Sequence, residues 1–403
     1  MNTWISSLIN MTSREHTIPK GWQKKQIKDL LDYERPDKYI VENDRYGVKG
    51  TPVLTANKSF ILGYTDETNG IYDAVPAIIF DDFTTDSKFV EFPFKIKSSA
   101  IKILKGKTPD VDLRFVYEKM KSINFPTGSH KRYYISQYQN MEVELPPIAE
   151  QQKIADMLKT VDEAINKTEE ILLKAEDLKR GVMERLLTEG INHTEFKQSA
   201  IGKVPKDWLV TKLGEIATIT RGGSPRPIED FITTDEDGLN WLKIGDIESG
   251  AKYITRTSQK IKKSGLSKTT QVHQGDFILS NSMSFGRPYI MKIDACIHDG
   301  WLAFKEIKDD LVTSEFLYYL LSSKILQSAF WSIAAGSGVK NLKRESVSNV
   351  VVALPPVIEQ QKIAEILSVA DEKVWVNRAI KEKLTLLKKG LMDDLLSGKK
   401  RTV

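Results

Sequence analysis

The segment LPPIAEQQKIADMLKTVDEAI at residues 145–165 decides the fold of this chain, because it returns as LPPVIEQQKIAEILSVADEKV at residues 354–374. The match continues without a gap to LKRGVMERLL at 178–187 and LKKGLMDDLL at 387–396, so the offset between the copies stays at 209 residues. A repeat of this length predicts one structural unit that is used twice.

Each copy follows a long mixed stretch, and these two stretches also open alike, with IPKGW at 18–22 and VPKDW at 204–208. The repeated unit is therefore a globular part followed by a helix. Copies of one surface pair most economically by an isologous contact, as in a two-fold dimer. We expect a molecule with pseudo-two-fold symmetry in which the two helices pair with each other.

Both helices are expected to begin at a double proline, which presets the dihedral angle of a first helical turn. Apolar residues spaced by three, four and seven predict a coiled-coil seam. In the first copy they are Ile154, Leu158, Val161, Ile165, Ala175, Val182 and Leu186, and in the second Ile363, Leu367, Ala370, Val374, Leu384, Leu391 and Leu395. Gly181 and Gly390 interrupt both helices at the same place. A close backbone approach or a kink would account for them.

A helix from Ile148 to about Leu187 would span roughly 60 Å at about 1.5 Å per residue. Such a length suits a spacer. Parallel pairing would bring the two globular parts into collision at one end, so we expect an antiparallel coiled coil. The alternative, two unrelated amphipathic helices, does not account for a gap-free repeat.

Composition narrows the class of protein without naming its function. The 403 residues allow two or three domains, and 59 Lys and Arg against 54 Asp and Glu give a mildly basic chain that permits a polyanionic partner. The single cysteine, Cys296, excludes an intramolecular disulfide. The first residues show neither a signal peptide nor a membrane helix, so we expect a cytoplasmic protein.

Between the repeats, short segments rich in β-branched and aromatic residues predict strands, and each series is followed by a helix. In the first globular part the strands are expected at 51–55, 59–65, 77–83, 89–97 and 99–104, and the helix at 111–123. In the second, strands are expected at 241–247, 275–282 and 287–293, and a helix at 314–330. Strands followed by a helix, twice, indicate two α+β domains.

No catalytic motif is evident. GKT at 106–108 lacks the glycine that a phosphate-binding loop needs five positions earlier, where Ile101 stands. Asp294 with Glu306 and Lys308 has a loose nuclease-like spacing that a charged chain often produces by chance. We expect no catalytic residue and no metal site in this chain.

The globular parts do offer basic and hydroxyl side chains in turns, which suit phosphates and base edges. Glycine-rich loops such as RGGSPRP at 221–227 let the backbone approach a ligand. A solvated surface charge is the simpler explanation for any single lysine, whereas the loops together favour nucleic acid. The candidate DNA-binding residues are Lys58, Tyr64, Lys88, Lys95, Lys97, His130, Lys131, Arg132, Arg221, Arg226, Lys260, Lys262, Lys263, Ser282, Arg287, Lys340 and Lys343.

With these motifs, the chain resembles the specificity subunit of a type I restriction-modification enzyme over nearly its whole length. The resemblance lies in two recognition domains that start near PxxW and two helices that open with LPPxxEQQKIA. RGGSPRP, WLKIGDIESG and GDFILSNSMSFGRPYI are similar to stretches of that family's recognition domains. The first domain resembles another subtype and is shorter, so the two halves are expected to read different sequences.

The resemblance implies that each domain reads a few base pairs of a bipartite, asymmetric DNA site, with the helices fixing the unread gap. Two methyltransferase subunits carrying S-adenosylmethionine would bind the helices and flip an adenine in each half-site. Motor-nuclease subunits using ATP and magnesium would join them, so this chain itself needs no cofactor. The candidate partner contacts are Glu150, Gln151, Lys153, Glu359, Gln360 and Lys362.

The predicted organisation is a target recognition domain at 1–144, a helical spacer at 145–190, a second recognition domain at 191–353 and a second spacer at 354–403. Two alternatives remain open at this point. A stand-alone DNA-binding or anti-restriction decoy protein would need no methyltransferase partner. A nuclease would cut DNA as an isolated chain with a metal ion.

Overall fold

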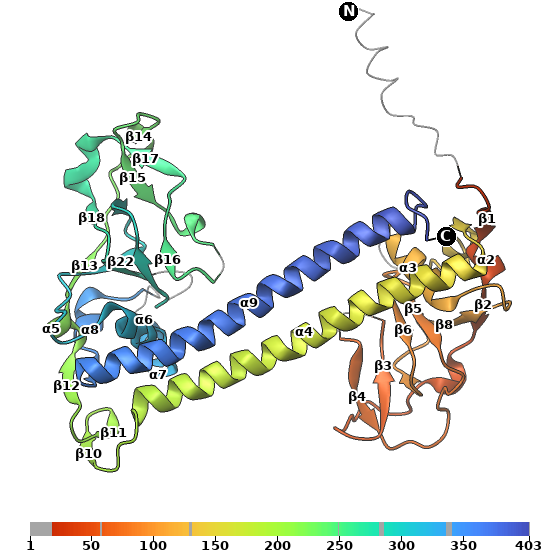
Figure 1. The fold of residues 1–403 in the computed structure, drawn as a ribbon, viewed down its shortest axis with the longest axis horizontal. Coiled ribbons are helices and arrows are strands. Elements are labelled where there is room, and N and C mark those ends of the chain that lie inside the picture. Colours follow the sequence, from red (N-terminus) through yellow and green to blue (C-terminus); the bar gives the residue numbers. More distant parts are fainter. Residues whose placement is uncertain are drawn as a thin grey trace, which may run out of the picture. The chain divides into compact units, whose positions relative to one another are not determined.

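The computed structural model describes residues 18–56, 59–128, 131–248, 250–281, 286–335 and 341–402. The chain divides into two compact units, unit 1 with residues 18–170 and 378–402, and unit 2 with residues 171–377. Each unit mixes helices with strands, as the sequence predicted (Figure 1). The division falls inside both long helices, α4 (Ile148–Thr188) and α9 (Val357–Leu395), so each unit contains half of each helix.

Unit 1 contains a four-stranded antiparallel sheet in the order β2-β8-β5-β6 and a three-stranded sheet in the order β4-β3-β7. Alternate residues of β5 face opposite cores: Ile78 and Phe80 pack with Phe115 of α3, whereas Ile79 packs with Ile103 in a separate cluster. The elements are β1 (Gln23–Gln26), α2 (Ile27–Leu30), β2 (Leu31–Glu34), η1 (Asp37–Tyr39), β3 (Thr51–Leu54), β4 (Ile61–Thr65), β5 (Ala77–Asp81), β6 (Ser87–Val90), β7 (Lys95–Ile96), β8 (Ile101–Gly106), α3 (Leu113–Ser122), η2 (Tyr138–Asn140) and β9 (Glu142–Leu145).

Unit 2 contains two five-stranded sheets, in the orders β13-β22-β19-β20-β16 and β14-β17-β15-β21-β18. Its larger core lies between the first of these sheets and the helices α6 and α7. The elements are β10 (Phe196–Ser199), β11 (Gly202–Pro205), β12 (Leu209–Lys212), α5 (Leu213–Ile216), β13 (Thr218–Arg221), η3 (Ile228–Asp230), β14 (Ile232–Thr233), β15 (Leu239–Leu242), η4 (Ile244–Asp246), β16 (Tyr253–Ile254), β17 (Gln259–Ile261), η5 (Lys263–Lys268), β18 (Thr270–Val272), β19 (Phe277–Ser280), β20 (Pro288–Met291), β21 (Ala295–Ile297), β22 (Trp301–Lys305), α6 (Ser314–Ser322), α7 (Lys324–Ala335), α8 (Arg344–Ser348) and β23 (Val351–Leu354).

Each globular part is closed by a pair of antiparallel strands that joins its first residues to its last. In unit 1, β1 pairs with β9 and brings Gln23 opposite Leu145, and in unit 2, β12 pairs with β23 and brings Leu209 opposite Leu354. The long helix begins three residues after each closing strand. The repeated PxxW and LPP motifs therefore meet in space within each unit.

The long helices begin as parts of the globular cores. Ile154 and Leu158 are buried in the core of unit 1, and Ile363 and Leu367 are buried in the core of unit 2. These four residues were expected to form a seam between the helices. Each cluster also contains a residue of the other long helix, Leu395 in unit 1 and Leu187 in unit 2, so this face packs on the domain and on the second helix together.

Further along the helices, ion pairs link α4 to α9 within each unit. In unit 1 the ammonium of Lys388 lies 2.7 Å from the Asp162 carboxylate, and that of Lys381 lies 2.8 Å from the Glu169 carboxylate. In unit 2 Lys179 pairs with Asp371. Residue numbers on α4 rise as those on α9 fall, so the two helix segments run in opposite directions inside each unit.

Four local predictions were wrong. The strand expected at 241–247 ends at Leu242, and Ile244–Asp246 form the 3-10 helix η4 instead. The strand expected at 89–97 is divided into β6 and β7, and Pro93, which has no amide hydrogen for a sheet ladder, lies in the break. The helix expected at 314–330 is divided at Ser323, whose backbone is extended (ψ 149°). Gly181 and Gly390 lie inside continuous helices, and a Cβ at either would meet no atom within 4 Å, so close packing does not explain them.

Candidate nucleic-acid interface

The first turn of α4 is tied to the start of the globular part by a buried carboxylate. Glu150 is fully buried. Its carboxylate accepts hydrogen bonds from Nε1 of Trp22 at 3.1 Å and from Nε and Nη2 of Arg401 at 2.7 and 2.8 Å. Burial by itself raises the pKa of Glu150, but the bonds from Arg401 and Trp22 outweigh it and hold the pKa below its ordinary value of 4.5. The bidentate pair therefore keeps this carboxylate charged inside the fold.

Unit 2 repeats the arrangement with a histidine in the place of the arginine. Glu359 accepts from Nε1 of Trp208 at 3.2 Å and from the backbone amide of Ile191 at 2.9 Å, and it lies 2.9 Å from Nε2 of His193. Gly190 has a positive φ of 68°, and a Cβ there would lie 2.4 Å from Glu359 Oε1. The chain after α4 thus packs against the start of α9, as Arg401 after α9 packs against the start of α4.

The glutamine after each of these carboxylates closes a second set of bonds. The Gln151 amide accepts from the backbone N–H of Asp112 at 2.8 Å and donates to the carbonyls of Asp110 at 3.0 Å and Pro146 at 2.8 Å. In unit 2, Gln360 makes the same three bonds to the Thr313 amide and to the carbonyls of Leu311 and Pro355, each at 2.8 Å. Asp112 and Thr313 are the N-caps of α3 and α6, so each glutamine fixes a helix of the globular part to the long helix.

These bonds change the predicted set of partner contacts. Glu150 and Gln360 are fully buried, Gln151 is 1% exposed, and the carboxylate of Glu359 is held by three groups of its own unit. Their polar atoms are used inside the chain, so we no longer propose them as partner contacts. Lys153 and Lys362 are exposed, although Lys153 Nζ donates to the Thr402 carbonyl at 3.2 Å.

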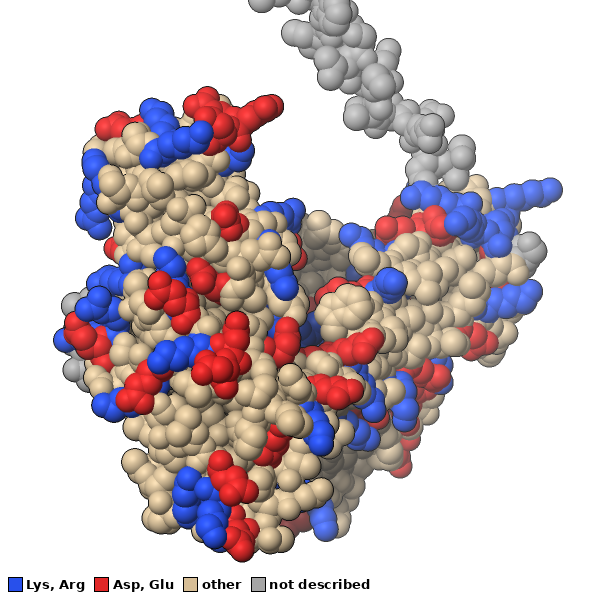
Figure 2. All heavy atoms as spheres, turned by 60° about the vertical axis from the view of Figure 1, so that its left-hand side comes forward, with Lys and Arg blue, Asp and Glu red and all other residues tan. Residues whose placement is uncertain are grey.

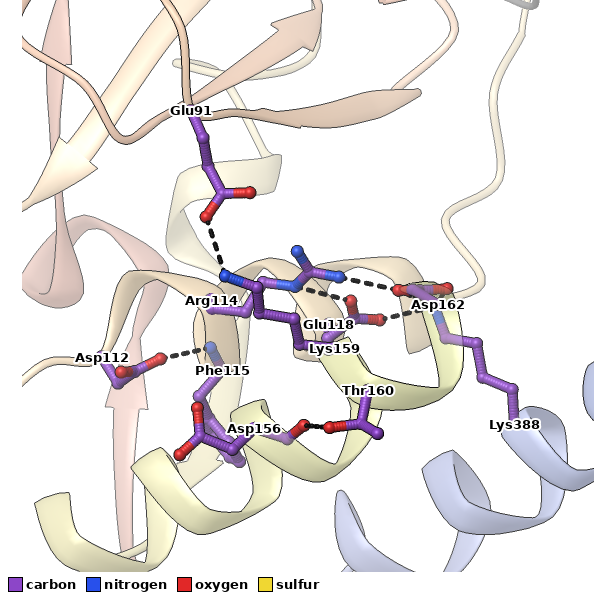
Figure 3. A network of polar contacts seen from close by, with 10 residues as sticks. All are labelled: Glu91, Asp112, Arg114, Phe115, Glu118, Asp156, Lys159, Thr160, Asp162 and Lys388. Carbon is purple, nitrogen blue, oxygen red and sulfur yellow. Dashed lines mark hydrogen bonds and ion pairs between the residues drawn. The ribbon is translucent and has the colours of Figure 1, made fainter. Parts of the chain in front are cut away.

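A network of charges holds α3 on the long helices in unit 1 (Figure 3). Arg114 donates to Glu118 at 3.1 Å and to Asp162 at 2.7 Å, and Lys388 lies 3.3 Å from Glu118 and 2.7 Å from Asp162. Glu118 is fully buried, so the two cations compensate its charge. In unit 2 the hydroxyl of Tyr319 on α6 donates to Asp371 at 2.8 Å in the corresponding place.

The candidate DNA-binding residues of unit 1 differ in their exposure and in the partners of their side chains. Lys95 is buried and pairs with Glu67 at 2.6 Å, so its charge is used internally and its assignment to DNA was wrong. Lys97 pairs with Asp44. Tyr64 on β4 and Lys88 on β6 are half-buried, whereas Lys131 and Arg132 are exposed. Lys58 and His130 lie outside the described residues.

In unit 2 the basic candidates lie in separate segments of the chain, with Arg221 at the end of β13, Lys260 on β17 and Lys263 at the start of η5. Lys260 and Lys262 donate to the carbonyls of Glu236 and Asp230 at 2.7 and 2.8 Å, and Lys263 pairs with Asp237 at 2.8 Å. Arg287 and Lys343 are exposed. Ser282 and Lys340 lie outside the described residues.

The RGGSPRP loop is organised by Asp299, which was not among the predicted candidates. The Asp299 carboxylate accepts from the Ser224 hydroxyl at 3.0 Å and lies 3.7 Å from Nη2 of Arg226, and its carbonyl accepts from Nε of Arg221 at 3.3 Å. The dipeptide Asp299-Gly300 is a recognisable turn signal. Nothing in the sequence, however, connects that turn to a loop 75 residues earlier.

Charged groups of both signs lie on the surface, and the carboxylates with nuclease-like spacing make separate local contacts. On the face in Figure 2, basic and acidic groups are interspersed between uncharged areas. Among the described residues, no three His, Cys, Asp or Glu side chains are grouped to hold a metal ion. Asp294 accepts a hydrogen bond from the backbone amide of Gln274 at 3.0 Å, and Glu306 accepts one from the Thr218 hydroxyl at 2.7 Å. The two carboxylates therefore make different local contacts.

The family of the chain follows from comparison with known proteins. The model of the type I restriction modification DNA specificity domain matches residues 19–175 and again residues 205–386. These two matches include most of both globular parts and of both long helices. The chain therefore belongs to the family of type I restriction-modification DNA specificity proteins, and the predicted resemblance is confirmed.

The sequences of two specificity subunits match this chain over most of their own length. The EcoR124I/EcoR124II specificity subunit of Escherichia coli is 29% identical over 86% of this chain and 85% of its own. The MjaVIII specificity subunit of Methanocaldococcus jannaschii is 27% identical over 95% of this chain and 94% of its own.

A solved structure supports the fold independently of close sequence similarity. A type I restriction-modification S subunit from M. genitalium superposes with a TM-score of 0.65 at 17% identity, covering 95% of this chain and 97% of that one. In the described part of this chain, no helix is long and apolar enough to cross a membrane.

Proposed function

We propose that this chain is the DNA sequence-specificity subunit of a type I restriction-modification complex, and that its two globular parts each read one half of a bipartite, asymmetric site. The observation that carries the proposal is the double family match at residues 19–175 and 205–386. The two domains differ in sheet architecture, which supports the reading of two different half-sites.

In this proposal α4 and α9 pair as an antiparallel coiled coil that fixes the gap between the half-sites, with a pseudo-two-fold axis relating the repeats. The ion pairs Asp162 to Lys388 and Asp371 to Lys179 support it, because each member of one pair is displaced by 209 residues from its counterpart in the other. A 41-residue helix is about 60 Å long, which is long enough to act as a spacer.

The chemistry would belong to partner subunits in the cytoplasm. Two methyltransferase subunits would supply S-adenosylmethionine and flip the target adenine out of the duplex. Motor-nuclease subunits would supply ATP hydrolysis, magnesium and cleavage. The exposed lysines Lys153 and Lys362 remain our candidates for contacts with these partners. A stand-alone decoy is disfavoured, since relatives that match nearly end to end are named as specificity subunits.

Sequencing of methylated adenines in DNA from cells with and without this gene tests the proposal. We expect one bipartite motif to lose its methylation when the gene is deleted. Replacement of residues 18–144 by the first recognition domain of another family member should change one half of the motif and leave the other half intact. An unchanged pattern of adenine methylation after deletion would contradict the proposed function.

A further inference from the structure

The RGGSPRP loop of unit 2 is held rigidly against the turn that contains Asp299. The backbone amide of Gly222 donates to the Trp301 carbonyl at 2.9 Å, and that of Gly223 donates to the Ile297 carbonyl at 3.1 Å. A Cβ on Gly222 would lie 2.0 Å from the His298 carbonyl oxygen, so only glycine allows this approach. The loop is therefore fixed before any ligand binds.

The turn is fixed from its other side as well. Asn281 is 1% exposed, and its Nδ2 donates to the Asp299 carbonyl at 3.4 Å while its Oδ1 accepts from the Leu342 amide at 2.6 Å. Nδ1 of His298 accepts from the Gly300 amide at 2.8 Å. Burial lowers the pKa of His298, which is consistent with a neutral ring in that role.

On this support, a chain of contacts leads from Ser224 to an exposed arginine. The Ser224 hydroxyl donates a hydrogen bond to Oδ1 of Asp299 at 3.0 Å. The other carboxylate oxygen, Oδ2, lies 3.7 Å from Nη2 of Arg226. The Arg226 side chain is 81% exposed. Its remaining donors are therefore available to a ligand, while Nη2 lies beside the Asp299 carboxylate.

We propose that Arg226 reads a guanine in the second half-site and that Asp299 is the residue that positions it. The inference rests on the proposed function. Arginine presents two parallel donors that match O6 and N7 of guanine in the major groove. Contact with a base edge requires this fixed geometry, whereas contact with a phosphate mainly requires positive charge.

The carboxylate itself favours a base edge over the phosphate backbone. Asp299 is 45% exposed beside Arg226, and it would repel a phosphate that approached the guanidinium. Burial raises the pKa of Asp299, but the hydrogen bond from the Ser224 hydroxyl and the nearby charge of Arg221 outweigh it and hold the pKa below its ordinary value of 3.8, so the carboxyl stays ionised at neutral pH. An arginine whose purpose was to bind phosphate gains nothing from such a neighbour.

The test uses the complex of this chain with its methyltransferase subunits and a duplex that carries its methylated motif. Each guanine of the second half-site is replaced in turn by 7-deazaguanine, which lacks N7. For the unaltered chain, one replacement should weaken binding by a part of the roughly 5- to 150-fold that a whole bidentate base contact contributes, because O6 of the guanine remains. For Arg226→Ala, which removes every donor of the side chain, the same replacement should have little further effect.

Asp299→Asn and Ser224→Ala should reduce the discrimination at that same position, although neither removes the arginine. Glu195→Gln, which breaks an exposed pair with Lys206 on the β10–β11 hairpin, is the charge-matched control and should leave every position unchanged. The first half-site serves as an internal control for folding, because its reading should persist in all of these variants.

Three outcomes would overturn the inference. The second half-site could contain no guanine in either strand, no 7-deazaguanine replacement could weaken binding, or the penalty could be undiminished in Arg226→Ala. Loss of both half-sites together in Asp299→Asn would also contradict a positioning role. The proposed function fails separately, if the unaltered complex methylates no bipartite motif.

Discussion

The ammonium of Lys388 on α9 lies 2.7 Å from both carboxylate oxygens of Asp162 on α4 (Figure 3). The same chemical pair recurs in unit 2 as Lys179 and Asp371, with the helices exchanged, so that the lysine now comes from α4. In each unit the aspartate also binds a helix of the globular part, through Arg114 in unit 1. One pair therefore joins both long helices to the domain beside them.

Removal of the Lys388 ammonium should destabilise unit 1 strongly. Lys388→Met removes one of the two cations beside the buried Glu118 carboxylate and leaves the Asp162 carboxylate next to it without that cation. Loss of one partner of a buried ion pair costs about 3–5 kcal/mol. Urea unfolding of the full chain measures the change. Lys381→Met is the matched control on the same helix, since Lys381 and Glu169 are 32% and 49% exposed and their pair should contribute about 1 kcal/mol or less. Equal effects of the two variants would contradict the assignment.

The contact between Arg401 and Glu150 should make the stability of unit 1 depend on acid. Because the pKa of Glu150 lies below its ordinary value of 4.5 in the folded chain, the pair contributes full stability above that pH. The contribution is lost as the pH falls through the lower folded value. In Arg401→Gln we expect lower stability at pH 7 and a flatter decline of the unfolding free energy below pH 4.5.

Unfolding by urea at a series of pH values from neutral to acidic measures this difference. Lys400→Gln is a suitable control, because Lys400 lies beside Arg401 in the chain but pairs with Asp394 instead of Glu150. An unaltered acid response in Arg401→Gln would show that another group keeps Glu150 charged.

Gln151 and Lys153, which both lie near the start of α4, should have different roles. Gln151→Ala leaves the Asp112 amide and two carbonyls without their partner, and each buried unsatisfied group costs about 1–3 kcal/mol. We expect a fall in the unfolding free energy of that order or more, with normal assembly of the protein that remains folded. Lys153→Glu should instead leave stability nearly unchanged and weaken assembly with the methyltransferase subunits. Co-purification and thermal unfolding distinguish the two outcomes, and the reverse pattern would contradict the division.

These residues also show how far the sequence could lead. The repeated LPP and EQQKIA motifs located both helix starts, because proline geometry and apolar spacing are local signals. The identity of Glu150 and Gln151 with Glu359 and Gln360 invited an assignment to a shared partner. The structure shows that repetition can equally preserve an internal bond, here to tryptophans far away in sequence.

The candidate site was harder to predict than the fold. Basic loops could be found from composition, but the burial of Lys95 beside Glu67 depends on contacts across the sheet that no local pattern carries. Asp299 was missed for the same reason, since its partners Ser224 and Arg226 follow a different strand. Local chemistry therefore identified the loop, and only tertiary contacts identified the residue that organises it.

The length of the paired helices should set the unread gap in the DNA site. Four residues inserted in α4 after Glu170 and four in α9 after Asn377 fall at the division between the units, so the ion pairs within each unit remain. The added length is about 6 Å, which corresponds to nearly two base pairs at about 3.4 Å each. We expect the methylated motif to keep both half-sites and to lengthen its gap. Insertions of two residues at the same places rotate each helix by about 200° and should abolish methylation. Methylome sequencing decides between these outcomes, and an unchanged gap with the four-residue insertions would refute the spacer role of α4 and α9.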